Sequence, residues 1–241
     1  MKTIYLDTID STNTYAKEHA NEFPKDTMTC INAEEQTKGR GRFQRSWISP
    51  KGVNLYATFY FTLPKTTLHL ISLSQVMAMS LVYLLQKKGL KPEIKWPNDI
   101  RLSEKKLAGI LSEIVFHQET VECFIGIGIN VNLSAESLKN IDQPATSLNV
   151  ETDKNWDRKE LLKELQDQFA NDLLRFKKEG FAPFHDEFED LLALKGKTIR
   201  CFDGEKIWEG ICHSITEEGQ LNIALEDGSM HTVLSGDIKS S

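Results

Sequence analysis

One short segment of this sequence concentrates cations and glycines in a way that could bind an anion. Residues 36–47 read Gln-Thr-Lys-Gly-Arg-Gly-Arg-Phe-Gln-Arg-Ser-Trp, in a chain whose formal net charge is -6. Glycine lets a backbone bend and approach a ligand closely, and the planar guanidinium of arginine donates paired hydrogen bonds to carboxylate or phosphate. A solvated surface loop fits such a segment equally well when it is taken alone. The residues of interest are Gly39, Arg40, Gly41, Arg42 and Arg45, with Trp47 able to cover a flat heterocycle.

A second polar segment follows the strand-like residues 93–96. Pro97 forces a turn there, which leaves Asn98 and Asp99 at the carboxyl edge of the strand, where ligands of α/β sheets commonly bind. A capped turn is the alternative explanation.

Two later segments add a lysine and a pair of glycines. Lys106 stands at the entrance to the small, apolar strand-like residues 107–111, as a site cation or as a gatekeeper of a strand edge. Gly126 and Gly128 share one face of a strand that ends near Asn130, which predicts a flat floor for a ligand or another backbone. Their spacing is not a dinucleotide-binding fingerprint.

The elements that must position these residues follow from hydrophobic periodicity. Residues 53–62 alternate apolar and polar side chains, which is the period of a strand, and residues 68–88 repeat apolar side chains at helical spacing before Gly89. Asp157 and Glu160 form a capping-box-like start for a long helix. The complete expectation is strands at 3–7, 29–33, 53–62, 93–96, 108–116 and 121–131, with helices after 10–13, at 68–88, from 157 to about 180 and at 183–194. A mixed sheet with helices packed on it accommodates this order.

The sequence pattern changes beyond Lys195, from long elements to short ones. Short strand-like runs are separated there by Asp203-Gly204, Glu218-Gly219 and Asp227-Gly228, which is typical of a small β-barrel or sandwich. We therefore expect two domains, residues 1–194 and 195–241.

Composition excludes several classes of protein. The acidic balance argues against a broad nucleic-acid or membrane surface. The four cysteines show no CxxC pair and the six histidines form no cluster, so we expect reduced thiols, no metal site and a cytoplasmic protein. The N-terminus has no signal-peptide pattern, and no apolar run approaches the length of a membrane span.

Read together and in order, these segments resemble the biotin protein ligase family. The resemblance covers essentially the whole chain and rests on DSTN at 10–13, GRGRxxRxW at 39–47, KWPND at 95–99, KLAGIL at 106–111 with Glu113, and GIGIN at 126–130. It implies an α/β catalytic domain similar to class II aminoacyl-tRNA synthetases and an SH3-like C-terminal domain. It also implies that biotin and MgATP form biotinyl-5'-AMP, from which biotin passes to a lysine of a carboxylase carrier protein, such as that of acetyl-CoA carboxylase.

The resemblance carries roles to matching positions. It places the biotin ring near the DSTN segment and Gln36, and it has the basic loop close over biotin and phosphate. Lys106 would be catalytic, while Asp99 would orient or deprotonate the acceptor lysine, or merely cap the Pro97 turn. The remaining positions are Ser11, Thr12 and Asn13 for biotin, Gly39, Arg40, Gly41 and Arg42 for the loop, Arg45, Trp47, Asn98 and Asn130 for the nucleotide, and Gly109 and Gly128 as close walls.

One departure and two rivals remain. The family often has Arg-Gly where this chain has Phe43-Gln44, which removes a cation and a hinge. A lipoate or octanoate ligase or transferase shares the fold but not the GRGRxxRxW and KWPND pair. A nonenzymatic ligand-binding or nucleic-acid-binding module could also use the loop, simply to bind phosphate. No N-terminal helix-turn-helix precedes the first strand, so we expect no operator binding, and a homodimer is compatible with the sequence.

Overall fold

The computed structural model describes residues 1–240 and divides them into two compact units. The first unit contains Met1–Leu68 and Lys105–Gln166. The second contains His69–Glu104 and the chain from Asp167 onward. Each unit holds strands and helices, and the expected mixed α/β fold with a separate C-terminal β-sheet is confirmed.

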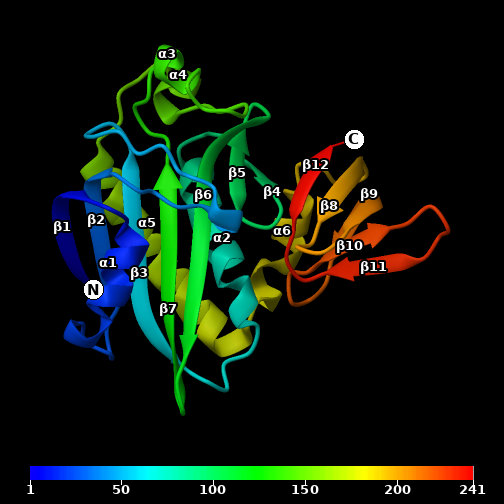
Figure 1. Ribbon diagram of the computed structural model, residues 1–241, viewed down its shortest axis with the longest axis horizontal. Coiled ribbons are helices and arrows are strands. Elements are labelled where there is room, and N and C mark those ends of the chain that lie inside the picture. The colour runs from blue at the N-terminus through cyan, green and yellow to red at the C-terminus, as the bar shows by residue number, and fades with distance from the viewer. Residues whose placement is uncertain (241) are drawn as a thin grey trace. The chain divides into compact units, whose positions relative to one another are not determined.

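The first unit is built on strands in the order β1-β2-β3-β7-β6. Strands β1 and β2 are parallel, and the other neighbours are antiparallel, so the sheet is mixed. Figure 1 shows α1 packed in front of this sheet. Its elements are β1 (Lys2–Ile9), α1 (Thr12–Glu18), η1 (Ala20–Glu22), β2 (Thr29–Gln36), η2 (Arg42–Gln44), β3 (Leu55–Pro64), β6 (Lys105–Phe116), β7 (Thr120–Ile129), α3 (Ala135–Leu138), α4 (Leu148–Thr152) and the start of α5 (Arg158–Glu179).

One face of this sheet carries both core and polar residues. At its α1 end, Ala16 and Phe23 pack against Ile31, Tyr60 and Phe124. Strand register puts Thr58 opposite Gly126 and Tyr56 opposite Gly128, and these pairs continue the face beyond the apolar cluster. The apolar cluster thus fixes α1 on the sheet, and the neighbouring positions of the same face are left for a site.

The alternation that predicts β3 has an unexpected cause. Tyr56, Thr58 and Tyr60 are as fully buried as the apolar residues between them. Both faces of β3 are therefore covered, and the polar positions mark the face that α1 and the loop cover rather than a solvated one.

The second unit contains a hairpin, helices and a five-stranded sheet. That sheet has the order β11-β10-β9-β8-β12 and is antiparallel throughout. Figure 1 shows it in orange and red. The elements are η3 (Leu70–Ser72), α2 (Leu73–Lys87), β4 (Glu93–Lys95), β5 (Asp99–Leu102), the rest of α5, η4 (Ala182–Phe184), α6 (His185–Asp190), β8 (Thr198–Phe202), β9 (Ile207–Ile215), β10 (Leu221–Ala224), β11 (Met230–Val233) and β12 (Asp237–Ser240).

Helix α2 is the apolar centre of the second unit. Residues Leu70–Lys87 are long and apolar enough to cross a membrane by length and composition alone, but 67% of that window is buried inside the protein. Within α2, Ser80 donates a hydrogen bond of 2.8 Å to the buried Asp172 of α5. The helix is therefore a core helix.

Most of the expected elements are present, and one local expectation is wrong. The polar residues 97–105 were expected to be a connection, but they contain β5, which pairs with β4 as a hairpin. At the start of α1, Ser11 is the N-cap, and its side chain makes no capping hydrogen bond. Asp157 does cap α5, accepting from the backbone N–H groups of Lys159 and Glu160. The domain boundary at Leu194 stays a prediction.

An ion cluster at the α1 side of the sheet yields a prediction about stability. Glu122 accepts hydrogen bonds from Lys25 at 2.6 Å and Tyr60 at 2.7 Å, and His117 lies 3.0 Å away. Burial raises the pKa of the Glu122 carboxyl, but these partners outweigh it and lower the pKa to about 2. The carboxylate is therefore ionised throughout the neutral range.

We expect Glu122→Gln to lower the free energy of unfolding at pH 7 by roughly 2 kcal/mol, given about 1.4 kcal/mol per pKa unit and some solvent screening of the exposed partner Lys25. A depressed folded pKa contributes stability above the unfolded pKa, and that contribution is lost as pH falls from about 4.5 toward 2. Urea unfolding between pH 7 and 3 measures this. A difference between wild type and variant that does not shrink on acidification would contradict it.

Candidate active site

The basic loop of the first unit folds as a small hairpin. The Gly41 N–H donates to the Arg45 carbonyl at 2.7 Å, and the Trp47 N–H donates to the Gly39 carbonyl at 2.9 Å. Arg40 and Ser46 form an antiparallel bridge between the two arms. The loop is thus an ordered hairpin whose backbone hydrogen bonds fix where its arginines begin.

The two glycines of this hairpin have different reasons to be glycine. A Cβ at Gly39 would collide with the Trp47 carbonyl oxygen and lie 2.6 Å from Ser49 Oγ and 3.1 Å from Gln36 Nε2. A Cβ at Gly41 would meet nothing closer than 3.5 Å. Only Gly39 is required by close packing.

The tip of the hairpin is conformationally strained. Phe43 has φ 52° and Gln44 has φ 59°, both in the left-handed region that favours glycine. The Arg42 guanidinium lies 5.0 Å from the centroid of the Phe43 ring. The chain therefore adopts a glycine-like turn with two large residues, at a cost of roughly 1–2 kcal/mol for each.

We expect Gln44→Gly to relieve part of this strain and to loosen the tip, because glycine enters many more backbone conformations. Trypsin should then cleave after Arg42 and Arg45 severalfold faster in the native protein, as followed by mass spectrometry of the fragments. Gln44→Ala is the matched control, since alanine keeps the restriction. Equal cleavage of the two variants would show that Gln44 does not stiffen the loop.

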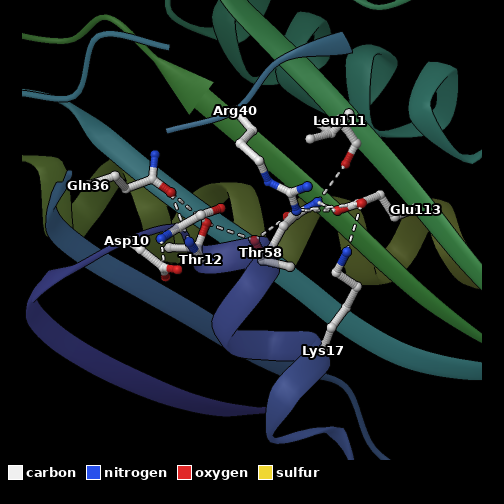
Figure 2. Close-up of polar contacts among 10 residues, drawn as sticks. Asp10, Thr12, Lys17, Gln36, Arg40, Thr58, Leu111 and Glu113 are labelled. Atoms are coloured by element: carbon white, nitrogen blue, oxygen red, sulfur yellow. Dashed lines mark hydrogen bonds and ion pairs between the residues drawn. The ribbon is translucent and has the colours of Figure 1, made fainter. Parts of the chain in front are cut away.

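A chain of hydrogen bonds links the start of α1 to β2 and β3 (Figure 2). Gln36 Oε1 accepts from the backbone N–H of Thr12 at 2.8 Å and from its hydroxyl at 3.1 Å. Thr58 Oγ1 lies 2.8 Å from Thr12 Oγ1 and 2.5 Å from Asn13 Oδ1. Thr12, Asn13 and Thr58 are buried, so these polar groups hold one another in fixed orientations.

The chain continues from Asn13 to a carboxylate of β6. Glu113 accepts hydrogen bonds from Asn13 Nδ2 at 2.9 Å, Lys17 Nζ at 2.9 Å and Arg40 Nη2 at 3.1 Å. Burial raises the pKa of the Glu113 carboxyl, but the hydrogen bonds from Lys17 and Asn13 and the charge of Arg40 more than reverse this, so the pKa is lowered. Two cations share one carboxylate, which leaves the cluster with a positive balance.

The space beside each of the two glycines of β7 is filled by another side chain of the protein. A Cβ at Gly126 would collide with Asn13 Oδ1, and one at Gly128 would lie 2.5 Å from the indole of Trp47. The predicted flat floor therefore lies under Asn13 and Trp47. The buried Trp47 Nε1 has no hydrogen-bond partner among residues 1–240.

Lys106 is held by its backbone and stands over an aromatic ring. Its N–H donates to the Pro144 carbonyl at 2.9 Å, and its carbonyl accepts from the Thr146 N–H at 2.9 Å. Its ammonium lies 5.4 Å from the centroid of the Trp47 ring, within the range of a cation–π contact. Thus Trp47 joins Lys106 to the basic loop.

Asn130 lies at the end of β7 and is buried, with both halves of its amide engaged. Its Oδ1 accepts from Asn54 at 3.4 Å, and its Nδ2 donates to the Thr146 carbonyl at 3.1 Å. The Thr146 N–H in turn donates to the Lys106 carbonyl, so Asn130 is linked to the backbone of Lys106 through Thr146. Its expected contact with a nucleotide stays a prediction.

Asn98 and Asp99 belong to the second unit. Asn98 is buried in the turn after the cis Trp96-Pro97 bond, and Asp99 begins β5 opposite Lys95. The parts of these two residues in the site stay predictions, as do those of Ser11, Gly109, Arg42 and Arg45.

The contacts of three residues near the site could not be predicted from the sequence. Thr58 was visible only as a polar position of an alternating strand, and Thr146 lies in a segment without a motif. Glu113 was noted within the resemblance, but nothing in the sequence gave it a partner. A run of polar residues on one buried face was the only available signal.

The mixed sheet, the cation-bearing hairpin and the buried polar chain define an α/β domain in which a cationic loop lies beside fixed, buried hydrogen-bonding groups. The sequence profile of the Biotin/lipoate A/B protein ligase family matches residues 5–130. The bifunctional ligase/repressor BirA of Escherichia coli K12 is 34% identical over 235 residues, which covers 97% of this chain and 72% of that protein. The biotin--[acetyl-CoA-carboxylase] ligase of Paracoccus denitrificans is 32% identical over 198 residues, which covers 79% of this chain and 82% of that protein.

A solved structure gives the same assignment. The biotin protein ligase from Aquifex aeolicus in complex with biotin and ATP is 32% identical, with a TM-score of 0.85 over 100% of this chain and 99% of that one. This chain belongs to the Biotin/lipoate A/B protein ligase family.

Proposed function

We propose that this protein is a biotin protein ligase. It joins biotin and ATP as biotinyl-5'-AMP with release of pyrophosphate, and it then transfers biotin to a carrier lysine with release of AMP. The observation that carries this proposal is the meeting of Arg40, Trp47 and Lys106 with the polar chain of α1 in one unit. The full-length similarity to the Aquifex protein supports biotin over lipoate.

The first step sets the need for cations. A carboxylate must approach an α-phosphate, and two like charges 4 Å apart repel by about 4 kcal/mol at an effective dielectric of 20. Arg40 and Arg42 would neutralise the reacting groups from the loop, and Lys106 from the sheet. A mobile ammonium can follow the charge as it moves from carboxylate to phosphate in the transition state.

The uncharged part of biotin requires fixed hydrogen-bonding groups. The ring is a cyclic urea with one carbonyl acceptor and two N–H donors, and it suits buried groups that cannot reorient. Ser11, Thr12, Asn13 and Gln36 would bind it. The hydrogen bonds of Thr12 to Gln36 and of Thr58 to Asn13 support this, because they hold these side chains in fixed orientations.

The nucleotide would lie on the Trp47 side. The unpartnered indole N–H and the ring itself offer a donor and a flat surface. Arg45, Asn98 and Asn130 would contact the nucleotide, with Gly109 and Gly128 as close walls. Mg²⁺ would enter on the phosphates of MgATP, since this ion usually keeps waters and needs few protein ligands.

The second step needs a neutral amine. A lysine with a pKa near 10.4 costs about 4.6 kcal/mol to deprotonate at pH 7. Asp99 would orient the acceptor lysine or take its proton. The acceptor would be the carrier protein or domain of a biotin-dependent carboxylase.

Charge and thiols bear on compartment and partners. All four cysteines are free and buried, which is compatible with a reducing cytoplasm. Burial raises the pKa of Cys30 to about 12 and that of Cys212 to about 11, so these two thiols stay protonated at neutral pH. The net charge of -6 argues against operator binding by this chain. Tight, salt-resistant binding in a gel-shift would overturn that expectation.

ATP–pyrophosphate exchange tests the function directly. We expect exchange that depends on biotin and is absent with lipoate, followed by a mass shift on the lysine of a carrier domain. Exchange with lipoate alone would indicate the lipoate branch of the family. No exchange with either acid, despite nucleotide binding, would indicate a nonenzymatic module.

A further inference from the structure

Glu113 is the point at which three segments of the first unit meet. Figure 2 shows the Glu113 carboxylate in contact with Lys17 of α1 and Arg40 of the loop. Asn13 is its third partner. The three donor–acceptor distances are 2.9, 3.1 and 2.9 Å, respectively. The partners lie 73 to 100 residues from Glu113 in the chain, so this contact exists only in the folded protein.

The geometry of Arg40 leaves most of its guanidinium available. Only Nη2 contacts Glu113, at 3.1 Å from one oxygen and 3.5 Å from the other. Its other two nitrogens have no hydrogen-bond partner among residues 1–240, and 41% of the side chain is exposed. An arginine anchored by one nitrogen presents the rest of its fork to an anion.

The geometry of Asn13 is fixed by the same carboxylate. Asn13 Nδ2 donates to Glu113 and to the Leu111 carbonyl, while Oδ1 accepts from Thr58. A carboxylate can only accept, so it forces the amide nitrogen toward β6 and the amide oxygen toward β3. The Glu113 carboxylate and the Leu111 carbonyl, which are both acceptors, therefore set the orientation of this buried amide together, and Glu113 makes the shorter of the two hydrogen bonds.

Glu113 also has contacts that would stabilise the fold irrespective of any ligand. The ion pair with Lys17 would by itself tie α1 to β6, and removal of any half-buried carboxylate lowers stability. Glu122 provides the comparison, because register places it on the same face of the sheet, with an ion pair to Lys25 at 2.6 Å. Glu122 contacts no residue expected to bind biotin.

We propose that Glu113 is a positioning residue for biotin, acting through Arg40 and Asn13. It sets the distance between the loop cation that receives the carboxylate and the amide that faces the ring. This inference rests on the proposed function and adds a specific determinant to it. Glu113 itself does not touch the reacting atoms.

Steady-state kinetics of exchange with Glu113→Gln test the proposal. Glutamine keeps the size and one acceptor oxygen, but it lacks the charge and can present an N–H to Asn13. We expect the KM for biotin to rise about tenfold, with the KM for ATP within twofold and kcat within threefold of wild type, as for loss of ground-state binding of one substrate. Isothermal titration with biotin alone should show the same tenfold loss.

A double-mutant cycle decides whether Glu113 acts through Arg40. If it does, adding Glu113→Gln to Arg40→Ala should raise the biotin KM less than threefold further. Glu122→Gln is the matched control, expected to lower thermal stability while the biotin KM stays within twofold.

Three results would overturn the proposal. The first is an unchanged biotin KM in Glu113→Gln. The second is an ATP KM that rises as much as the biotin KM in that variant. The third is a double variant whose biotin KM rises by the product of the two single-variant increases. A Glu113→Gln protein that loses stability yet binds biotin normally falls under the first of these. Failure of the proposed function is distinct, because wild-type protein would then show no biotin-dependent exchange and no binding of biotin.

Discussion

Lys106→Ala should lower the rate of biotin adenylation by a factor on the order of 10² to 10³, while biotin affinity changes less than about fivefold. The size is that of removing one preorganised charge from a transition state. The structure supports a large effect because the Lys106 backbone is clamped at both its N–H and its carbonyl by residues 144–146. The side chain therefore starts from a fixed point on the strand.

Single-turnover formation of biotinyl-5'-AMP and a separate titration of biotin measure the two quantities. Lys105→Ala is the control. Lys105 is an exposed lysine that directly precedes Lys106 in β6, so its side chain points to the other face of the sheet from that of Lys106. We expect the control to stay within twofold of wild type. If adenylation and biotin affinity fall equally in Lys106→Ala, the lysine serves ground-state binding and has no special role in the transition state.

Gly39→Ala should reduce kcat/KM for biotin by about 10²-fold, because a displacement near 1 Å in a positioning element has costs of this size. The new methyl group would meet the Trp47 carbonyl and Ser49 Oγ. Relief requires the hairpin arms to separate, which breaks the 2.9 Å hydrogen bond from Trp47 to Gly39. The substitution therefore displaces Trp47 and Arg40 together.

The matched comparison is Gly41→Ala, in the same hairpin and with no contact closer than 3.5 Å. Its thermal midpoint should equal that of wild type, whereas Gly39→Ala should lower the midpoint by several degrees. Activity and thermal unfolding are measured on the same preparations. If both variants behave alike, crowding at Gly39 does not govern the loop.

The sequence alone determined the family and most of the elements. The order of five short motifs defined a biotin protein ligase-like chain, and the family match and the Aquifex structure bear this out. Periodicity located β3, α2 and α5 because local hydrophobic patterns suffice for long elements. It missed β5 because the strand has only four residues directly after the Pro97 turn, too few for their polar–apolar alternation to stand out.

The tertiary structure decided how the candidate residues use their groups. It showed that Asn13 and Trp47 fill the spaces at Gly126 and Gly128. It also showed that the Asn130 amide is hydrogen-bonded to Asn54 and to the Thr146 carbonyl. It also joined Glu113 to Arg40 across 73 residues. Such contacts depend on strand register and on where a loop returns to the sheet, which no local pattern encodes. The basic loop could therefore be recognised from its residues, whereas the carboxylate that anchors it could be found only in the folded chain.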